Sequence, residues 1–367
     1  MRVAFDYQAF TMQPYGGISR YFMHLVQEYL SFDEQVKIFA PIHINAYLAS
    51  LPSECVQGRR LNRYPAKTTR FFTMYNRLVS RSTIEQWRPD ILHETYYARH
   101  ASSSKKCPIV ITVYDMIHEL LHQEFPPRDN TACIKKIAIA RADHVICISE
   151  NTKKDLINLY EIPEHKISVV LLGFDQFANQ AHAAQSQPKN GKPFLLYVGA
   201  RGGYKNFAGF LKSVAASPSL KSDFDLLTFG GGKFKDAELS LIASLGFSSN
   251  QVRQISGDDT LLGSYYAMAR AFVYPSLYEG FGIPPLEAMA HNCPVVSSNA
   301  SSMLEVIGQA GEYFNPANTE EMQHAIESVV YSDRRVAELK ALGTARLAHF
   351  SWAKCAEQTR SVYRKLL

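Results

Sequence analysis

Two glutamates flank a glycine-containing turn in the second half of the chain. Glu279 and Glu287 stand on either side of Gly280-Phe281-Gly282-Ile283-Pro284-Pro285. The prolines predict that a helix begins here, and a helix N-terminus preceded by glycines offers backbone N–H groups to an anion such as phosphate. A carboxylate beside a phosphate is repelled unless it binds a hydroxyl, so we expect the two glutamates to bind sugar or ribose oxygens.

Two cations follow an apolar run earlier in the same half. Arg201 and Lys205 come shortly after the run 194–198. Two positive charges at the end of a strand can neutralise a diphosphate leaving group. The alternative for either residue is a solvated loop cation.

Two further loops could approach a nucleotide. Gly230 and Gly231 follow the run 225–229, and Ile255 and Ser256 end the next one. Glycines let a base or phosphate approach the main chain. The alternative for both is an ordinary tight turn, the second with an aspartate cap on a helix over 261–268.

The first half carries candidate residues at similar positions. Gly16 and Gly17 join the first strand region to a helix, without the Gly-x-Gly-x-x-Gly dinucleotide fingerprint. Asp115 and His118 follow the β-branched run 109–113, and we expect them to act as acid–base groups on an acceptor. For His118 a purely structural role is the alternative.

The elements that position these residues alternate in type. Short apolar runs are separated by helix-length segments in both halves, which is typical of parallel sheets in α/β proteins. In between, residues 176–193 are rich in Ala, Gln, Asn, Gly and Pro and are predicted to be a linker. We therefore expect two doubly wound domains whose ligands bind at the carboxyl ends of the strands, around one cleft.

The segment Pro-Ser-Leu-Tyr-Glu-Gly-Phe-Gly-Ile-Pro-Pro-Leu-Glu-Ala-Met-Ala, residues 275–290, resembles the Glu-x7-Glu signature of the family-4 retaining glycosyltransferases of GT-B fold. The resemblance implies two Rossmann-like domains: residues 1–175 bind the acceptor and residues 194–350 bind the donor. It also implies that residues 351–367 form a helix that packs back on the first domain. The function it implies is transfer of a hexosyl unit from a nucleotide sugar to a hydroxyl of a glycan or lipid-linked glycan, with retention.

The resemblance also implies a role for each matching residue. Glu279 would contact the donor sugar and Glu287 the ribose. The diphosphate and sugar would be bound by Gly16, Gly17, Arg201, Lys205, Gly280, Phe281 and Gly282, and the rest of the nucleotide by Gly230, Gly231, Ile255 and Ser256. Tyr114 stands where many relatives have a histidine, which leaves Asp115 and His118 as the acceptor-side candidates. No cofactor and no metal is expected, because Arg201, Lys205 and the backbone N–H groups of the turn would stabilise the departing diphosphate. UDP-glucose is the favoured donor and GDP-mannose the alternative.

Composition and charge limit the partners and the compartment. The 367 residues are 46% hydrophobic and carry a formal charge of +5, and the six cysteines show no metal-ligand spacing. Seven basic and no acidic residues lie between Glu54 and Glu85, with aromatic residues among them. The segment 59–81 could contact an anionic membrane or a diphosphate-lipid acceptor, or be a solvated helix face. Because basicity is confined to this segment, we expect no nucleic-acid partner. The scattered cysteines and the lack of a long apolar stretch predict a cytoplasmic protein. Contact of residues 59–81 with lipid would place it on the inner face of the cytoplasmic membrane.

Three other functions share parts of this pattern. A nicotinamide dehydrogenase would need a glycine fingerprint that is absent. An epimerase or phosphorylase of GT-B fold would share the architecture without a glycan acceptor. A scaffold without catalytic activity would not need Glu279, Glu287 and Lys205 together.

Overall fold

The computed structural model describes residues 1–32, 34–103, 107–175 and 192–367. The chain divides into two compact units, Met1–Gly173 with Ser351–Leu367, and Phe174–Phe350. Residues 176–191 of the predicted linker lie outside the described residues. Among the described residues, no helix is long and apolar enough to cross a bilayer.

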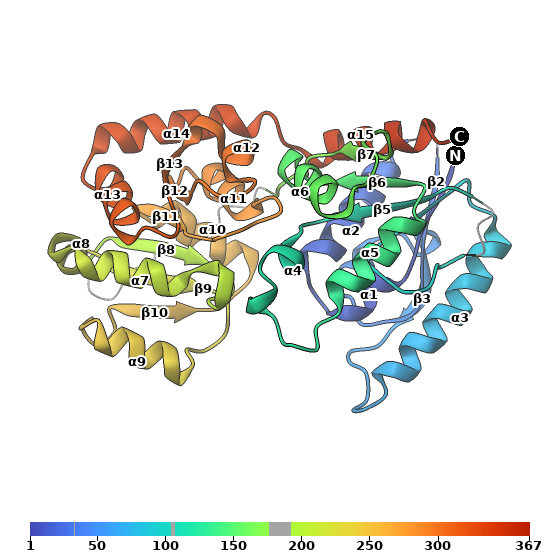
Figure 1. Cartoon of the computed structure of the whole chain (residues 1–367), viewed down its shortest axis with the longest axis horizontal. Helices are drawn as coiled ribbons and strands as arrows, with labels where there is room; N and C mark the ends of the chain where they lie inside the picture. The colour runs from blue at the N-terminus through green and yellow to red at the C-terminus, as the bar shows by residue number, and fades with distance from the viewer. Residues whose placement is uncertain (33, 104–106, 176–191) are drawn as a thin grey trace. The chain divides into compact units, whose positions relative to one another are not determined.

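The first unit is built on a parallel sheet with the strand order β3-β2-β1-β4-β5-β6-β7 (Figure 1). Its strands are β1 (Arg2–Phe5), β2 (Gln35–His43), β3 (Val56–Arg60), β4 (Ile91–Glu94), β5 (Ile109–Val113), β6 (His144–Cys147) and β7 (Ile167–Val169). Its helices are α1 (Gln8–Met12), α2 (Gly17–Tyr29), α3 (Thr69–Trp87), α4 (Ile117–Leu120), α5 (Thr131–Arg141), α6 (Glu150–Tyr160) and α15 (Trp352–Arg364).

The central strands of this sheet follow the apolar runs of the sequence. All five residues of β5 are buried, because a parallel strand is covered on both faces. The sequence pattern did not reveal β3, whose residues Val-Gln-Gly-Arg-Arg are mostly exposed. This strand pairs only with β2 at the edge of the sheet, so it needs no continuous apolar run.

The last helix, α15, belongs to the first unit although it ends the chain. The Trp352 ring stacks on His24 of α2, with centroids 4.4 Å apart. A Cβ at Gly173 would lie 2.4 Å from the Trp352 nitrogen, so only glycine allows this approach. On the same helix, the Tyr363 hydroxyl lies 2.5 Å from Nδ1 of buried His93 on β4. These contacts attach α15 to the sheet and to its covering helix.

The second unit has a parallel sheet with the order β10-β9-β8-β11-β12-β13. Its strands are β8 (Phe194–Val198), β9 (Asp225–Phe229), β10 (Val252–Ile255), β11 (Ala271–Tyr274), β12 (Val295–Ser298) and β13 (Gly311–Phe314). Its helices are α7 (Phe207–Ala216), α8 (Pro218–Asp223), α9 (Asp236–Ser244), α10 (Asp259–Met268), α11 (Ile283–Ala290), α12 (Met303–Ile307), α13 (Thr319–Val330) and α14 (Asp333–Leu347).

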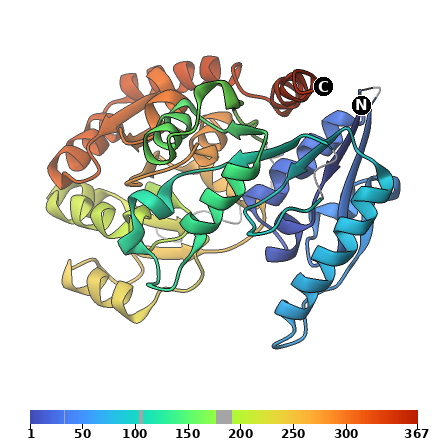
Figure 2. The same ribbon diagram turned by 45° about the vertical axis from the view of Figure 1, so that its right-hand side comes forward.

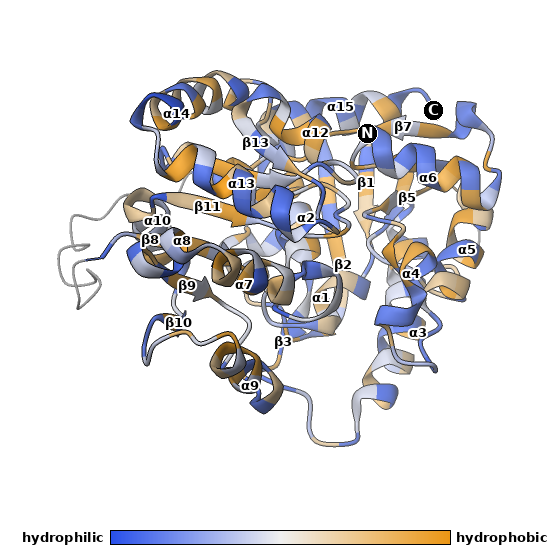
Figure 3. Ribbon diagram, turned by 60° about the vertical axis from the view of Figure 1, so that its left-hand side comes forward, coloured by the Kyte–Doolittle hydropathy of each residue, from blue (hydrophilic) through white to orange (hydrophobic). Residues whose placement is uncertain are grey.

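The core of this unit lies where helices cover the sheet. Leu195 and Val273 of neighbouring strands are fully buried together with Phe210 of α7 and Ile326 of α13. Hydrophobic colour therefore concentrates on strands such as β11 (Figure 3). The predicted α/β class with two Rossmann-like domains is confirmed, and the polar loops that follow the strands are left to form the site.

Candidate active site

A short ion pair joins two predicted site residues from different loops of the second unit. Lys205 ends the 3-10 turn η6 (Gly203–Lys205) after β8, and Glu279 lies in the loop after β11. The lysine Nζ is 2.6 Å from Glu279 Oε1, and both side chains are largely but not fully buried. The backbone also joins these loops, since the Leu277 N–H donates to the Tyr204 carbonyl at 2.7 Å. Parallel strands thus place a cation and a carboxylate at one edge of the sheet.

A buried tyrosine lies beside this ion pair. Tyr274 ends β11, and the Lys205 Nζ is 5.7 Å from its ring centroid. Burial, and then the Glu279 carboxylate, raise the pKa of Tyr274 well above its usual value. The tyrosine therefore stays neutral and can donate a hydrogen bond to the carboxylate.

The turn between Glu279 and α11 is held by two serines that the sequence analysis did not single out. The Glu279 N–H donates to Ser301 Oγ at 2.8 Å. The Ser302 hydroxyl lies 2.9 Å from the Glu279 carbonyl and 2.8 Å from the Phe281 carbonyl. Gly282 has a φ of 110°, which disfavours any side chain at the residue that caps α11. The loop geometry is thus set by a neighbouring segment that carries no recognisable sequence signal.

Phe281 and Glu287 are both buried. The Phe281 ring packs edge-on against Phe350, so only its backbone is available to a ligand. Glu287 on α11 is 5% exposed, with its Oε2 3.5 Å from the Tyr266 hydroxyl. Its carboxylate is therefore buried beside α10.

Arg201 lies deep in the second unit and binds the loop that follows β9. Its side chain is 2% exposed, and its Nε lies 2.7 Å from Glu238 Oε1. The guanidinium also donates to the carbonyls of Gly230, Gly231, Gly232 and Lys233 at 2.9 to 3.4 Å. The three glycines all have positive φ, from 70° to 85°. Arg201 therefore stabilises the glycine loop, whereas Lys205 meets Glu279; a contact of Arg201 with the diphosphate stays a prediction.

The loop after β10 combines a helix cap with exposed main chain. Asp258 accepts a hydrogen bond from the Leu261 N–H at 2.9 Å and caps α10, which the alternative interpretation of this segment predicted. The Gln254 amide reaches the Gly230 carbonyl, the Ile255 carbonyl and Ser256 Oγ. This bridge holds the glycine loop next to Ile255 and Ser256, so the four predicted nucleotide-binding positions of these two loops lie together.

In the first unit, Gly16 and Gly17 begin α2. Gly16 is the residue that caps the helix, with extended backbone, and Gly17 is its first residue. A Cβ at Gly17 would meet nothing within 4 Å. The helix start therefore has room for a ligand beside Gly17, although its role toward a diphosphate stays a prediction.

Asp115 and His118 each have protein partners at the end of β5. Asp115 Oδ1 accepts from the Ile117 N–H at 3.1 Å and lies 3.6 Å from the Nζ of buried Lys135. The His118 ring stacks on Phe125 with centroids 3.9 Å apart, and its Nδ1 is 3.2 Å from Asp129. The two residues thus have different partners, and their catalytic roles stay predictions.

A buried polar cluster around Asp6 lies at the ends of β1 and β4. Asp6 is fully buried and accepts hydrogen bonds at 2.6 Å from Gln8, Thr95 and Ser102. Glu94 accepts from the Ser102 N–H and pairs with Arg141. Burial, and then the nearby Asp6, raise the pKa of Glu94 to about 7. The sequence signal was an acid directly after β1 and an acid that ends β4.

Tyr114, directly after β5, has a structural role. Its hydroxyl donates to the Thr95 carbonyl at 3.1 Å, and its N–H donates to the Tyr97 hydroxyl at 3.2 Å. Its side chain is buried in this packing.

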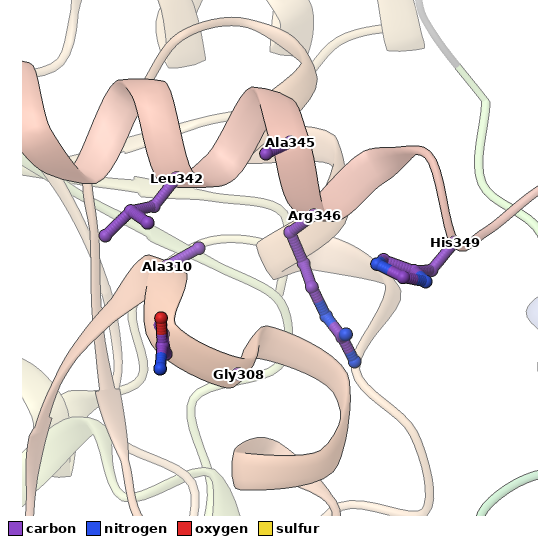
Figure 4. Close-up of a pocket in the computed structure, with 7 residues that line it drawn as sticks. Gly308, Ala310, Leu342, Ala345, Arg346 and His349 are labelled. Carbon is purple, nitrogen blue, oxygen red and sulfur yellow. The ribbon is translucent and has the colours of Figure 1, made fainter.

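A surface cavity of about 300 Å³ lies in the second unit between α14 and the 3-10 turn η7 (Gly308–Ala310) (Figure 4). It is lined by Gly308, Gln309, Ala310, Leu342, Ala345, Arg346 and His349. None of these is a predicted site residue. The Arg346 guanidinium is bound to the Glu305 and Val306 carbonyls, so it fixes α14 against the neighbouring segment.

Comparison with known protein families assigns the class. A model of glycosyl transferases group 1 matches residues 178–344, and a model of glycosyltransferase family 4 matches residues 15–176. The chain belongs to the family-4 glycosyltransferases of GT-B fold, and it is a glycosyltransferase.

Its relatives include three enzymes named as mannosyltransferases. The chain is 26% identical to O-antigen chain mannosyltransferase B of Escherichia coli, over 96% of this chain and 97% of that one. It is 30% identical to the serotype-specific mannosyltransferase WbdA of Escherichia coli, over 62% of this chain and 29% of that one. For O-antigen chain mannosyltransferase RfbU of Salmonella typhimurium, the identity is 29% over 60% of each chain. The chain thus spans less than a third of WbdA.

Solved structures agree in fold. A sucrose-phosphate synthase from Thermosynechococcus elongatus has a TM-score of 0.80 at 20% identity, covering 100% of this chain and 98% of that one. The Anabaena HepE protein in complex with UDP-glucose has a TM-score of 0.76 at 16% identity, covering 100% of both chains.

Proposed function

We propose that this glycosyltransferase moves a mannosyl unit from GDP-mannose to a hydroxyl of a glycan or lipid-linked glycan. The observation that carries the reaction type is the 2.6 Å pair of Lys205 and Glu279 beside the start of α11. The relatives named as mannosyltransferases support mannose over glucose as the transferred sugar. UDP-glucose, the donor expected from the sequence, is the alternative, and the same residues would serve either donor.

The proposed mechanism uses the pair to organise the leaving group. Lys205 would turn from Glu279 to the donor diphosphate, and the glutamate would then bind a hydroxyl of the sugar. Backbone N–H groups of the turn 280–282 and the N-terminus of α11 would share the phosphate charge. Because Lys205 provides a cation at this position, we propose that no metal is needed.

The bond changes follow from this arrangement. The bond between the anomeric carbon and the diphosphate oxygen breaks, and the acceptor oxygen bonds to the same carbon from the same face. The departing phosphate takes the acceptor proton, so anomeric configuration is retained and no separate base is required. Asp115 and His118 would orient the acceptor.

Buried Glu287 is proposed to bind the ribose through its carboxylate. A hydroxyl that donates to a buried carboxylate forms a charge-assisted hydrogen bond, stronger than a neutral one. The glycine loop and the adjacent residues 255 and 256 would contact the base through the main chain.

The experiment measures nucleotide binding and transfer in parallel. Wild type, Lys205→Ala and Glu287→Gln are compared in thermal unfolding with GDP, UDP, ADP and their sugars, with and without EDTA. A ligand at ~100 times its dissociation constant stabilises the folded state by ~2.7 kcal/mol. We expect GDP-mannose to stabilise the wild type in EDTA, and each variant to bind ~10- to 100-fold more weakly, since each loses a charge-assisted hydrogen bond.

Exposed Glu320 on α13 provides the matched control, and Glu320→Gln should bind like the wild type. Transfer from GDP-mannose to a mannoside acceptor, followed by NMR of the new anomeric centre, tests retention. Stabilisation by UDP-glucose alone would replace mannose by glucose in the proposal. Wild-type affinity for the nucleotide sugar in both Lys205→Ala and Glu287→Gln would contradict the proposed site. A product with inverted anomeric configuration would contradict the proposed mechanism.

A further inference from the structure

Helix α3 carries its apolar side chains on the outside. Phe71, Met74, Tyr75 and Leu78 are 59%, 51%, 41% and 58% exposed. Their spacing of i, i+3, i+4 and i+7 places them on one side of the helix. We call these four residues the outer stripe of α3.

The inner side of α3 is attached to the sheet largely by polar bonds. Asn76, Ser80 and Ile84 are buried. The Asn76 amide donates to the Ile42 carbonyl at 2.8 Å and its oxygen accepts from the Ile42 N–H at 2.7 Å. The Ser80 hydroxyl donates to the Phe39 carbonyl at 3.2 Å. The middle of α3 thus contacts the sheet mainly through polar side chains, and Ile84 near its C-terminus joins the apolar core. The outer stripe takes no part in this contact and stays exposed.

Positive charge surrounds the outer stripe. At about 100° per residue, Arg70, Arg77 and Arg81 share one flank of the stripe. Exposed Arg59 and Arg60 lie on edge strand β3, and exposed Arg63 and Lys67 lie in the connection to α3. Between Glu54 and Glu85 the sequence has no acidic residue, and Glu85 itself pairs with Arg81 at 3.2 Å. Figure 2 shows α3 (light blue) along the outside of the first unit.

We propose that the outer stripe of α3 docks on an anionic lipid bilayer. The helix would lie in the plane of the interface, with the four apolar side chains among the upper acyl chains and the basic residues on lipid phosphates. An anionic bilayer accommodates both the apolar outer stripe and the positive charge around it. A second copy would bring the same seven positive charges against each other in a symmetric contact, and a nucleic acid would leave the aliphatic side chains in contact with water.

The placement of α3 has a consequence for the acceptor. Asn76 bonds to Ile42 near the carboxyl end of β2, and the Tyr64 hydroxyl donates to the same carbonyl at 3.0 Å. The docking surface thus adjoins the edge of the sheet at which Asp115 also lies. If the proposed function holds, a lipid-linked glycan in the same bilayer would reach this edge from the docked side.

Vesicle sedimentation of the full chain tests the docking. Vesicles of phosphatidylcholine with about 30 mol% phosphatidylglycerol are compared with pure phosphatidylcholine at about 0.15 M salt. We expect the wild type to bind the anionic vesicles, and Phe71→Ser/Leu78→Ser to bind them at least ~10-fold more weakly because apolar burial is lost. Arg70→Gln/Arg81→Gln should lose ~10-fold or more on anionic vesicles and become less sensitive to salt.

The controls separate this surface from folding and from the sugar site. Leu159→Ser/Leu239→Ser changes two exposed leucines on α6 and α9 and should bind like the wild type. Thermal unfolding with nucleotide should be the same in all of these variants. A Phe71→Trp variant should show a blue-shifted emission on anionic vesicles only.

The proposal is overturned if the wild type does not sediment with anionic vesicles, or if both α3 variants bind as well as the wild type. It is also overturned if the leucine control loses as much binding, or if the stripe variant instead converts a dimer to a monomer in solution. Loss of nucleotide binding in Lys205→Ala with intact sedimentation would confirm that lipid docking and the sugar site are separate properties.

Discussion

At the scale of single residues, two cations of one loop differ in what they contact. Lys205 is paired with Glu279, while Arg201 is bound by the glycine loop and Glu238. A guanidinium has five donors in a planar fork, which suits several carbonyls at once, whereas an ammonium is a compact point charge. Their side-chain chemistry explains why the arginine organises backbone and the lysine is available to exchange partners.

Replacing Arg201 by lysine should lower stability. The lysine keeps the charge but leaves several loop carbonyls without a donor, so the free energy of unfolding should fall by about 1–3 kcal/mol. Urea unfolding followed by circular dichroism measures it. Arg335→Lys, whose pairs with Glu312 and Glu338 are more exposed, should cost less than about 1 kcal/mol. Equal losses in both variants would contradict the buried role of Arg201.

His93 should make the protein sensitive to acid. Burial lowers its pKa to about 3, whereas the unfolded chain titrates near about 6.5. Between these values the unfolded state binds the extra proton, so stability from neutral His93 is present above about 6.5 and is lost as the pH falls toward 3. The raised pKa of Glu94 acts in the opposite direction, because there the folded state holds the extra proton between about 7 and about 4.5.

A His93→Gln variant isolates the histidine, since Glu94 is present in both proteins. We expect the stability advantage of the wild type over this variant to shrink from pH 7 to pH 4. The free energy of unfolding at several pH values measures the difference. An advantage that stays constant, or grows in acid, would show that His93 is not neutral in the folded state.

At the scale of elements, α11 and α2 each have a glycine at the N-terminus, and the two glycines are needed for different reasons. Gly282 caps α11 with a φ of 110°, and a Cβ there would lie 2.7 Å from the Met303 Cε. Gly17 starts α2 with open space around it and no positive φ. Gly282 is required by the backbone conformation, whereas Gly17 is required only if a ligand lies against it.

Alanine substitutions should therefore separate stability from ligand approach. Gly282→Ala should lower stability by about 1–3 kcal/mol through backbone strain and weaken donor binding. Gly17→Ala should leave stability unchanged or raise it by up to about 1 kcal/mol, yet raise the KM for the donor if a diphosphate lies against it. Thermal unfolding and donor KM are measured on both. An unchanged KM in stable Gly17→Ala would remove Gly17 from the donor site.

At the scale of the whole molecule, the two units are connected differently. The second unit is one continuous segment, whereas the first needs both Met1–Gly173 and Ser351–Leu367. Most of the proposed donor residues lie in the second unit. Removal of α15 would also remove Tyr363, and would leave its buried partner His93 without this contact.

A fragment of residues 174–350 should fold cooperatively and bind the nucleoside diphosphate within about tenfold of the full chain, because its core is its own. It should transfer no sugar, since the proposed acceptor residues are absent. Calorimetric melting and nucleotide titration measure both. A folded fragment that does not bind nucleotide would place an essential donor contact in the first unit.

The order of α and β segments, most strands and the pair Glu279 and Glu287 were predicted from the sequence. Buried parallel strands require continuous apolar runs, and a helix that begins after glycines and prolines has a local signal. Edge strand β3 lacked such a run, and β13, with only two of its four residues buried, was also missed.

Only the tertiary structure decided what each polar side chain contacts. The pairing of Lys205 with Glu279, the burial of Arg201 in a glycine loop, the Asp6 cluster and the outward apolar face of α3 all depend on segments distant in the chain. Local spacing predicts which residues share an edge or a face. It does not determine which partner lies across from them, because that is set by how neighbouring strands and helices pack.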